Sequence, residues 1–349
     1  MTLHFQVTES KERGIIGTTN IKQITGKHFN PDGERKTNIF MKRKGLKLSI
    51  ASIGILECIN QYIDSYVVKR ESKTNLKYYK WENGNIYYTV NGKGQPLLLI
   101  HDLNVFSSEK DWSEIVKRLS QKYKIYTVDL PGCGRSDKPA ITYTNYFYVQ
   151  AITDFIKKII QEKTNVVVSG RSSSFVLMAD SLTPNLIDEI YMINPPSFAT
   201  LNRQLGKYAK VLKTLLGLPV IGRTCYYIAT NRTNTEYYLS EKCFFNPFHM
   251  KQCHVKAAYQ ASHNQRGKGK YLLASLEGNY LNVDITKALK NRKGKTVLII
   301  GEKENSSAEI SAEYSKIREN LIIYTIKNTK HLPQLEMPED VCNLIQTES

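Results

Sequence analysis

Short apolar strands alternate with amphipathic helices along most of this chain, and no other feature of the sequence restricts the fold as much. The run PLLLIHD, residues 96–102, places its apolar residues in succession, which is typical of a strand buried on both faces. Helical spacing follows in DWSEIVKRLSQ, residues 111–121, and another apolar strand follows in YKIYTVDLPG, residues 123–132. This alternation predicts a mostly parallel sheet that is covered by helices on both faces.

The alternation continues to the end of the chain with one interruption. Further strands are expected in NVVVSG (165–170), IDEIYMINP (187–195), TVLIIGEKE (296–304) and NLIIYTIKN (320–328). Residues from about 196 to 281 are instead mostly helical in pattern and rich in polar and aromatic side chains. Because ligands bind at the carboxyl edge of such sheets, we expect this segment to form a helical cap over that edge.

The first seventy residues differ in composition from the rest of the chain. Residues 1–40 have little periodicity and many Thr, Asn, Gly and Lys residues, so we expect a disordered extension there. Residues 41–70 are expected to form a helix that begins with the basic run MKRK, and Met41 resembles a natural translation start. Residues 71–349 are then expected to form the main domain.

Three placements are open for this N-terminal helix. It packs on the main domain, it lies in the interface of an anionic membrane, or it acts as a signal anchor with its basic end in the cytoplasm. Only Leu48 to Leu56 are strongly apolar and free of charge, whereas a spanning helix needs about twenty such residues.

The charge of the chain limits its partners. The net charge is +17, from 49 Lys and Arg residues against 32 Asp and Glu residues. Such a balance favours anionic surfaces, and residues 41–64 are the segment that we expect to meet a membrane. No nucleic-acid motif is present, so no nucleic-acid partner is predicted.

The cysteines and histidines indicate the compartment and argue against a metal site. The six cysteines form no CxxC pair and no disulfide framework, which is typical of a cytoplasmic protein with reduced thiols. The cluster of Cys243, His249, Cys253 and His254 fits no common zinc spacing. We therefore predict no metal and no cofactor, and the sequence leaves the oligomeric state open.

Three serines in a row stand between the strand NVVVSG and the helix that follows. A nucleophile on such a turn projects from the sheet, adopts a strained conformation with positive φ, and needs small residues two positions before and after it. Ser172 meets this requirement, with Gly170 before it and Ser174 after it. Ser173 and Ser174 do not, because a larger residue occupies one of the two positions. Ser172 is therefore the predicted nucleophile.

A serine nucleophile needs a base and a third group that orients the base. His331, in NTKHLPQLEMPE, is the only histidine after the last strand, and it is the predicted base. Glu304, at the end of TVLIIGEKE, is the predicted acid, with Glu302 as the second choice. The backbone N–H groups of Ser173 and Leu103 are predicted to form the oxyanion hole.

Several segments in this order resemble the α/β-hydrolase superfamily, namely LLLIHDLN, YTVDLPGCGRSDKP, SGRSSSF, LIIGEKE and KHLPQLEMPEDV. The resemblance extends from about Lys77 to Ile345, which is most of the chain. It implies an eight-stranded, mostly parallel sheet, an inserted helical cap, and a triad of Ser172, Glu304 and His331.

Two residues depart from the pattern of that superfamily. Asp102 stands where a glycine usually follows the histidine, and Glu304 stands where Asp is more usual. Asp102 would place a negative charge near the developing oxyanion. Haloalkane dehalogenases and epoxide hydrolases of this fold use Asp as the nucleophile, so Ser172 argues against both.

Together these features predict a serine hydrolase that cleaves an ester or thioester of an apolar acyl or aryl compound through an acyl-enzyme. We expect His101, Asp102 and Phe175 to contact the substrate. The alternative is a hydrolase-like binding or scaffold protein with weak or no activity, which the unusual Asp102 and the three serines favour. Acyl transfer and hydrolysis of a C–C bond by the same triad stay open.

Overall fold

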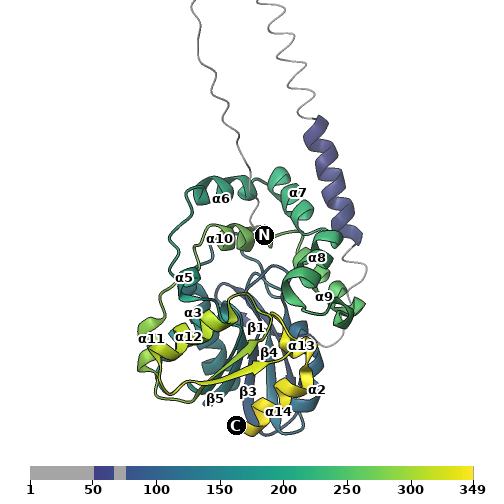
Figure 1. Cartoon of the computed structure of the whole chain (residues 1–349). Coiled ribbons are helices and arrows are strands. Elements are labelled where there is room, and N and C mark those ends of the chain that lie inside the picture. The colour runs from purple at the N-terminus through teal and green to yellow at the C-terminus, as the bar shows by residue number, and fades with distance from the viewer. Residues whose placement is uncertain (1–50, 67–75, 349) are drawn as a thin grey trace, which may run out of the picture. The chain divides into compact units, whose positions relative to one another are not determined.

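The computed structural model describes residues 51–66 and 76–348. At its centre is an eight-stranded sheet in the order β1-β2-β4-β3-β5-β6-β7-β8 (Figure 1). The strands are β1 (Lys77–Trp81), β2 (Gly84–Asn91), β3 (Gln95–Ile100), β4 (Tyr123–Val128), β5 (Thr164–Ser169), β6 (Ile187–Ile193), β7 (Thr296–Gly301) and β8 (Ile322–Ile326). The predicted eight-stranded sheet is therefore confirmed.

Most of the sheet is parallel, also as predicted. Only β1 and β2 run antiparallel to their neighbours, and the pairs from β4 through β8 are parallel. Parallel strands direct their carboxyl ends to the same edge, so the loops that follow β3, β5, β6, β7 and β8 meet there. That edge therefore holds the residues that the sequence places after these strands.

Strand β3 explains why an uninterrupted apolar run is needed. Leu97 and Leu99 belong to the core on one face of the sheet, and Leu98 and Ile100 belong to the core on the other. All four side chains are fully buried. Because side chains alternate between the faces along a strand, a strand with helices on both sides has no position for a polar residue.

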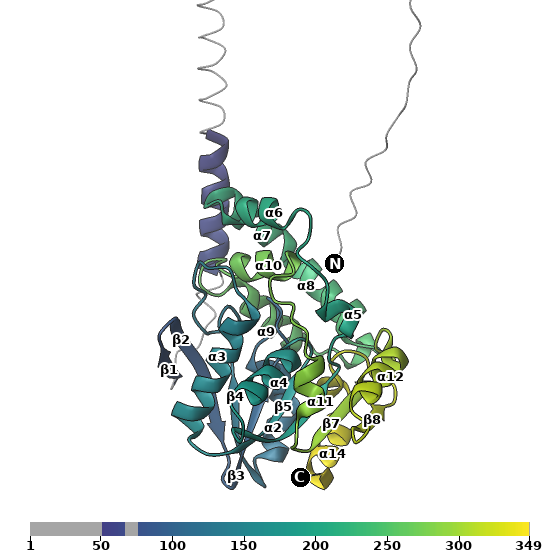
Figure 2. The same ribbon diagram turned by 90° about the vertical axis from the view of Figure 1, so that its left-hand side faces the viewer.

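Helices cover both faces of this sheet (Figure 2). The core that holds Leu98 includes side chains of α3 (Asn145–Phe155), η2 (Ile156–Ile160), α4 (Ser172–Leu182), α11 (Thr286–Asn291) and α12 (Ser307–Ile317). The core that holds Leu97 includes side chains of η1 (Glu109–Trp112), α2 (Ser113–Leu119) and α14 (Pro338–Glu348). A further short helix, α13 (Pro333–Glu336), precedes α14.

Between β6 and β7 the chain forms a helical insertion, in the segment where the sequence predicts a cap at about 196 to 281. Its elements are α5 (Phe198–Leu201), α6 (Ala209–Gly217), α7 (Val220–Ala229), α8 (Arg232–Tyr238), η3 (Leu239–Cys243), η4 (Pro247–His249), α9 (Gln252–His263) and α10 (Lys270–Glu277). Asn104, in the loop after β3, donates a hydrogen bond to the Tyr238 hydroxyl at 3.1 Å. The insertion therefore contacts the carboxyl edge of the sheet.

The helix expected at residues 41–70 is described only in part. Residues 51–66 are helical, and the remainder of that prediction lies outside the described residues, as does the extension predicted at 1–40. Within residues 51–66 and 76–348, no helix combines the length and the apolar character that crossing a membrane requires.

Asn194, directly after β6, fixes the loop that carries His331. Its side-chain amide donates to the carbonyl oxygens of Lys330 at 2.7 Å and His331 at 3.0 Å. Its side-chain oxygen accepts from the N–H of Gly301 at the end of β7 at 2.9 Å. The loop is thus joined to the ends of both strands, which limits where the imidazole of His331 can lie.

Candidate active site

The sharp turn between β5 and α4 lies at Gly170. This residue has a φ of +57°, its N–H donates to the Ile193 carbonyl at 2.8 Å, and its carbonyl accepts from the N–H of Ser173 at 3.2 Å. Ser172 lies within α4 and is not among the residues with positive φ. The prediction of a strained turn at Ser172 is therefore wrong, because the chain reverses two residues earlier. Glycine is the residue that adopts positive φ most readily.

A side chain at position 170 would collide with Asp102. A β-carbon built on Gly170 would lie 2.1 Å from Oδ1 and 2.2 Å from Cγ of Asp102. These distances are far below van der Waals contact, so only glycine fits while Asp102 stays in place. The Asp102 carboxylate therefore fills the space that the side chain of the turn residue would otherwise take.

The serines after the turn are internal residues. The Ser172 side chain is fully buried, and its hydroxyl donates to the backbone carbonyl of His101 at 2.7 Å. The Ser174 hydroxyl donates to the carbonyl of Arg171 at 2.8 Å. The N–H of Ser173, predicted to serve the oxyanion hole, is bound to Gly170. The hydroxyls of Ser172 and Ser174 and the N–H of Ser173 are thus all bound to backbone carbonyl groups.

Asp102 contacts two groups at the carboxyl edge of the sheet. Its Oδ1 accepts a hydrogen bond from the backbone N–H of Arg171 at 2.7 Å, and its Oδ2 lies 3.3 Å from Nε2 of His331. Burial alone would raise the pKa of this carboxyl, but the hydrogen bond and charge of His331, with the N–H of Arg171, hold it below its usual value. Asp102 is therefore a carboxylate at neutral pH.

The structure brings His331 and Glu304 together and leaves Ser172 apart from them. Nδ1 of His331 lies 3.2 Å from Oε2 of Glu304, and the other ring nitrogen faces Asp102 rather than Ser172. Glu302, the second choice for the acid, is exposed and accepts from the N–H of Asn328 instead. The three side chains that meet at this edge are Asp102, His331 and Glu304.

The two carboxylates change the charge of His331. Burial alone would lower the pKa of this imidazole, but the hydrogen bonds and charges of Asp102 and Glu304 outweigh it and raise the pKa to about 10. An imidazolium that lies between two carboxylates is stabilised by both of them. His331 is therefore protonated at neutral pH, and it is a proton donor before it can be a base.

A pocket opens beside these residues, between the sheet edge and the helical insertion. Most of its wall is apolar, and its polar members include Asp102, His331 and Asp111; its lining is completed by Phe106, Ser107, Lys110, Tyr238, Leu239, Cys243, His254, Ala257, Ala258, Leu332 and Leu335. Within the described residues, Oδ2 of Asp111 is buried and has no hydrogen-bond partner. Burial raises the pKa of Asp111 well above its usual value.

The remaining predicted site residues lie behind the pocket. His101 is fully buried, its Nδ1 lies 2.7 Å from the carbonyl of Asp102, and its Nε2 accepts from the N–H of Leu130. Burial lowers its pKa to about 4, so the ring is neutral. Phe175 is fully buried and stacks on Tyr148 at 5.0 Å between ring centroids. Neither lines the pocket, so the expected substrate contacts of both are wrong.

Leu103 is also buried in the core. The prediction that its backbone N–H contributes to the oxyanion hole stays a prediction.

Two features of this turn are absent from the sequence-based prediction. One is Gly170 as the turn residue, and the other is the N–H of Arg171 as the donor that follows it. A signal for both was present, because Gly170 is the only glycine between β5 and α4 and positive φ favours glycine.

A model of the Alpha/beta hydrolase family matches residues 97–344. Among curated proteins, the chain is 29% identical over 108 residues to a 2-hydroxy-6-oxo-6-(2'-aminophenyl)hexa-2,4-dienoic acid hydrolase of Metapseudomonas resinovorans. That match covers 30% of this chain and 37% of the relative. The chain thus matches well under two thirds of the length of this relative.

Solved structures resemble this one over most of its length. A serine hydrolase involved in carbazole degradation superposes with a TM-score of 0.63 at 17% identity, covering 78% of this chain and 97% of that one. An epoxide hydrolase without ligand superposes with a TM-score of 0.61 at 14% identity, with the same two coverages of 78% and 97%. At such identities the likeness concerns the fold.

Replacing Asp102 with Asn should lower the pKa of His331 well below 10, because one of the two stabilising charges disappears while burial stays. The C–H signals of His331 in a pH titration by NMR report this directly. Asp111→Asn is the matched control and should leave the titration of His331 unchanged, because Asp111 is not among the groups whose hydrogen bonds and charges raise the pKa of His331.

The same charge pair makes stability depend on pH. The pKa of His331 is raised from an ordinary value of 6.5 to about 10 on folding, so its contribution is complete below about pH 6.5 and is lost as the pH rises to about 10. Urea unfolding of the wild type should show this loss, and Asp102→Asn should reduce it. A pH dependence equal in both proteins would contradict the ion pair.

Proposed function

Because the chain belongs to the alpha/beta hydrolase family, we propose that it hydrolyses its substrate through the carboxylate of Asp102 rather than through a serine hydroxyl. One observation carries the proposal. The Asp102 carboxylate fills the side-chain position of Gly170 and lies between the N–H of Arg171 and the imidazole of His331. In this fold the nucleophile projects from that turn, and the next N–H serves the oxyanion hole.

An epoxide is the substrate class that best suits this arrangement. A carboxylate is a competent nucleophile in enzymes, and attack on a strained ring carbon gives an ester, which water can hydrolyse. Attack on an ester or thioester would instead give a mixed anhydride. The mostly apolar pocket wall, with Phe106, Leu239 and Leu335, suits an apolar epoxide.

In the first step, Oδ2 of Asp102 bonds to one epoxide carbon and the ring C–O bond breaks. The electron pair of that bond goes to the ring oxygen, which takes the Nε2 proton of His331. His331 carries this proton at neutral pH because its pKa is raised to about 10. The contact between Nε2 of His331 and Oδ2 of Asp102 places this proton beside the oxygen that attacks the epoxide carbon.

In the second step, the loss of the Asp102 charge lowers the pKa of His331, so the neutral imidazole becomes a base held by Glu304. It takes a proton from water as the water oxygen attacks the ester carbonyl carbon. The oxyanion forms at Oδ1, on the N–H of Arg171. The bond to the diol then breaks, the diol oxygen takes the proton from His331, and the Asp102 carboxyl returns its own proton to His331.

An ester or thioester reaction through Ser172 has less support. The Ser172 hydroxyl would have to leave the carbonyl of His101 and reach a ring nitrogen that contacts Asp102. It would also need a neutral His331, whereas the two carboxylates favour the charged form.

A binding or scaffold role is the second candidate, and one observation favours it. The N–H of Arg171, which would serve an oxyanion, already has the Asp102 carboxylate as its partner. If Asp102 never reacts, this contact leaves no free N–H at the turn to stabilise an oxyanion, and the site cannot catalyse hydrolysis. The covalent step at Asp102 separates the two candidates.

We expect His331→Gln to accumulate the ester, because it removes the base of the second step. The ring oxygen must then take its proton from water, so the ester should form more slowly than it does in the wild type. Incubated with styrene oxide, this variant should gain the mass of one styrene oxide on the peptide that holds Asp102, as measured by mass spectrometry. The wild type should form the diol and carry no adduct. The double variant His331→Gln/Asp102→Ala is the control and should stay unmodified.

An adduct on any other residue would contradict the role of Asp102. If the wild type forms no diol and His331→Gln forms no adduct across epoxides of increasing size, the binding role is favoured.

The geometry also predicts how to create a serine enzyme. In Asp102→Gly/Gly170→Ser, the new serine occupies the turn, faces His331 and has the N–H of Arg171 free. We expect a fluorophosphonate probe to label this double variant and not the wild type. Gly170→Ser alone should be destabilised, because its β-carbon would collide with Asp102.

The added variant Ser172→Ala tests the competing assignment. In the double-variant background it should leave the labelling intact. Labelling of the wild type that disappears in Ser172→Ala would contradict the proposal and restore Ser172 as the nucleophile.

A further inference from the structure

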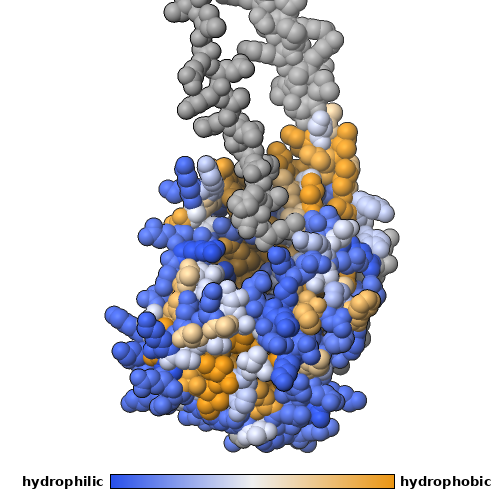
Figure 3. All heavy atoms as spheres, viewed as in Figure 1, coloured by the Kyte–Doolittle hydropathy of each residue, from blue (hydrophilic) through white to orange (hydrophobic). Residues whose placement is uncertain are grey.

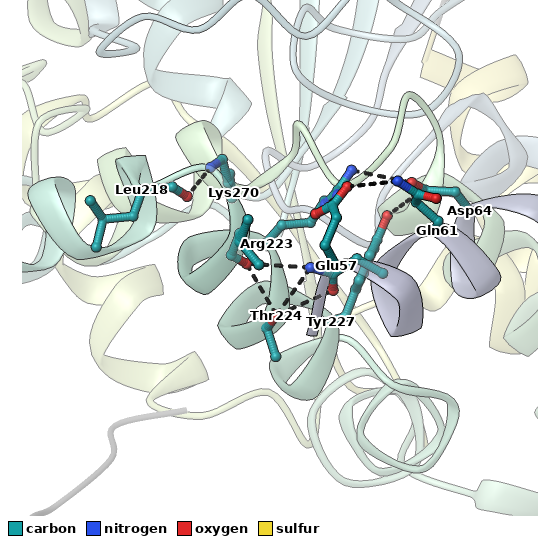
Figure 4. Close-up of polar contacts among 10 residues, drawn as sticks. Glu57, Gln61, Asp64, Leu218, Arg223, Thr224, Tyr227 and Lys270 are labelled. Carbon is teal, nitrogen blue, oxygen red and sulfur yellow. Dashed lines mark hydrogen bonds and ion pairs between the residues drawn. The ribbon is translucent and has the colours of Figure 1, made fainter. Parts of the chain in front are cut away.

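The helix at residues 51–66 contacts the helical insertion through its polar side chains. Figure 4 shows Glu57 and Asp64 turned toward Arg223 and Tyr227 of α7. Arg223 pairs with Glu57 and lies 3.3 Å from Asp64, and the Tyr227 hydroxyl donates to Asp64. Asn60, which is fully buried, donates to the Thr224 hydroxyl at 3.1 Å.

The opposite side of this helix is apolar and exposed. Ile55, Ile59, Tyr62 and Tyr66 have exposed fractions of 63%, 48%, 72% and 45%. At about 100° per residue, these four side chains form one stripe, directly across the helix from the stripe of Glu57, Asn60 and Asp64. A surface helix normally buries its apolar stripe and exposes its polar one. Here Ile63 packs on the core, but the polar stripe is turned to α7 and four apolar side chains face outward.

The helix α6, which packs on α7, also exposes a stripe of apolar side chains. Tyr208, Val211, Leu215 and Leu218 follow each other at helical spacing and are 69%, 65%, 41% and 40% exposed. In Figure 3 hydrophobic residues gather around the helix at 51–66 and the neighbouring part of the insertion. Scattered exposed apolar residues are ordinary, but stripes of them on two helices that both contact α7 mark a contact surface.

Positive charge accompanies this apolar surface. Lys207, Lys210 and Lys213 lie on or beside α6 and are exposed. Apolar side chains flanked by Lys and Arg are typical of helices that bind anionic lipid.

We propose that the exposed stripes of the helix at 51–66 and of α6 lie on the surface of an anionic membrane. The polar network with α7 holds the polar side of the helix against the helical insertion. The apolar side is then left free to contact the lipid. This contact requires only insertion of side chains among the headgroups and upper acyl chains, and so it is compatible with the absence of a spanning helix from residues 51–66 and 76–348. The inference is independent of the chemistry at Asp102.

Flotation of the full chain with lipid vesicles tests the proposal. The wild type should bind vesicles that contain phosphatidylglycerol much more strongly than vesicles of phosphatidylcholine alone, and salt should weaken the binding. Ile55→Glu/Ile59→Glu should lower the partition onto anionic vesicles by about tenfold or more. Val211→Glu/Leu215→Glu tests the stripe on α6 in the same way.

Tyr146→Glu/Leu182→Glu is the matched control, because both residues are 58% exposed and belong to α3 and α4 rather than to the stripes. It adds the same two negative charges outside the stripes, so it should lower the partition onto anionic vesicles less than the stripe variants do. Thermal unfolding of each variant checks that the fold is kept.

Three results would overturn the proposal. The wild type fails to bind anionic vesicles, the stripe variants bind as the control does, or the wild type is a dimer without lipid that Ile55→Glu/Ile59→Glu converts to a monomer. The last result would assign the surface to a second copy of the chain.

Discussion

The contact of the Asp102 carboxylate with the N–H of Arg171 and the imidazole of His331 organises the carboxyl edge of the sheet. It requires a residue without a side chain at the turn, which is Gly170, and it explains why a β-carbon there has no room. Because Asp102 contacts Nε2 of His331, the hydroxyl of Ser172 does not meet this histidine and instead donates to the backbone carbonyl of His101. The loop that Asn194 fixes then keeps His331 opposite Asp102.

Electrostatics decides which chemistry this arrangement can perform. A serine hydrolase needs a neutral histidine that accepts a proton from the hydroxyl, whereas His331 lies between two carboxylates and has a pKa raised to about 10. Such a histidine gives up a proton before it takes one. A reaction that begins with attack by a carboxylate and protonation of a leaving oxygen uses the charge state that the site already has, and it releases the base only after Asp102 has lost its charge.

Much of the fold was predictable from the sequence, because apolar runs such as Leu97–Ile100 can be buried on both faces only in a parallel sheet with two helical layers. The contact between His331 and Glu304 was also predictable, since each residue follows a strand whose end is fixed by that pattern. The turn was not, because Ser172 has small residues two positions before and after it, whereas Gly170 has Val168 two positions before it. The spacing rule therefore favoured Ser172, while the backbone reverses at Gly170. The face that the helix at 51–66 turns to α7 was likewise unpredictable, since it depends on Arg223 and Thr224, far away in the sequence.

The most direct test of the account follows oxygen through a single turnover. With wild-type protein in excess over styrene oxide in water enriched in oxygen-18, attack by Asp102 leaves an oxygen of the carboxylate in the diol and places the heavy oxygen in Asp102 itself. Mass spectrometry of the diol and of the peptide that holds Asp102 should therefore find the label in the peptide. Label in the diol, with an unlabelled Asp102, would mean that water attacks the substrate directly and would contradict the account.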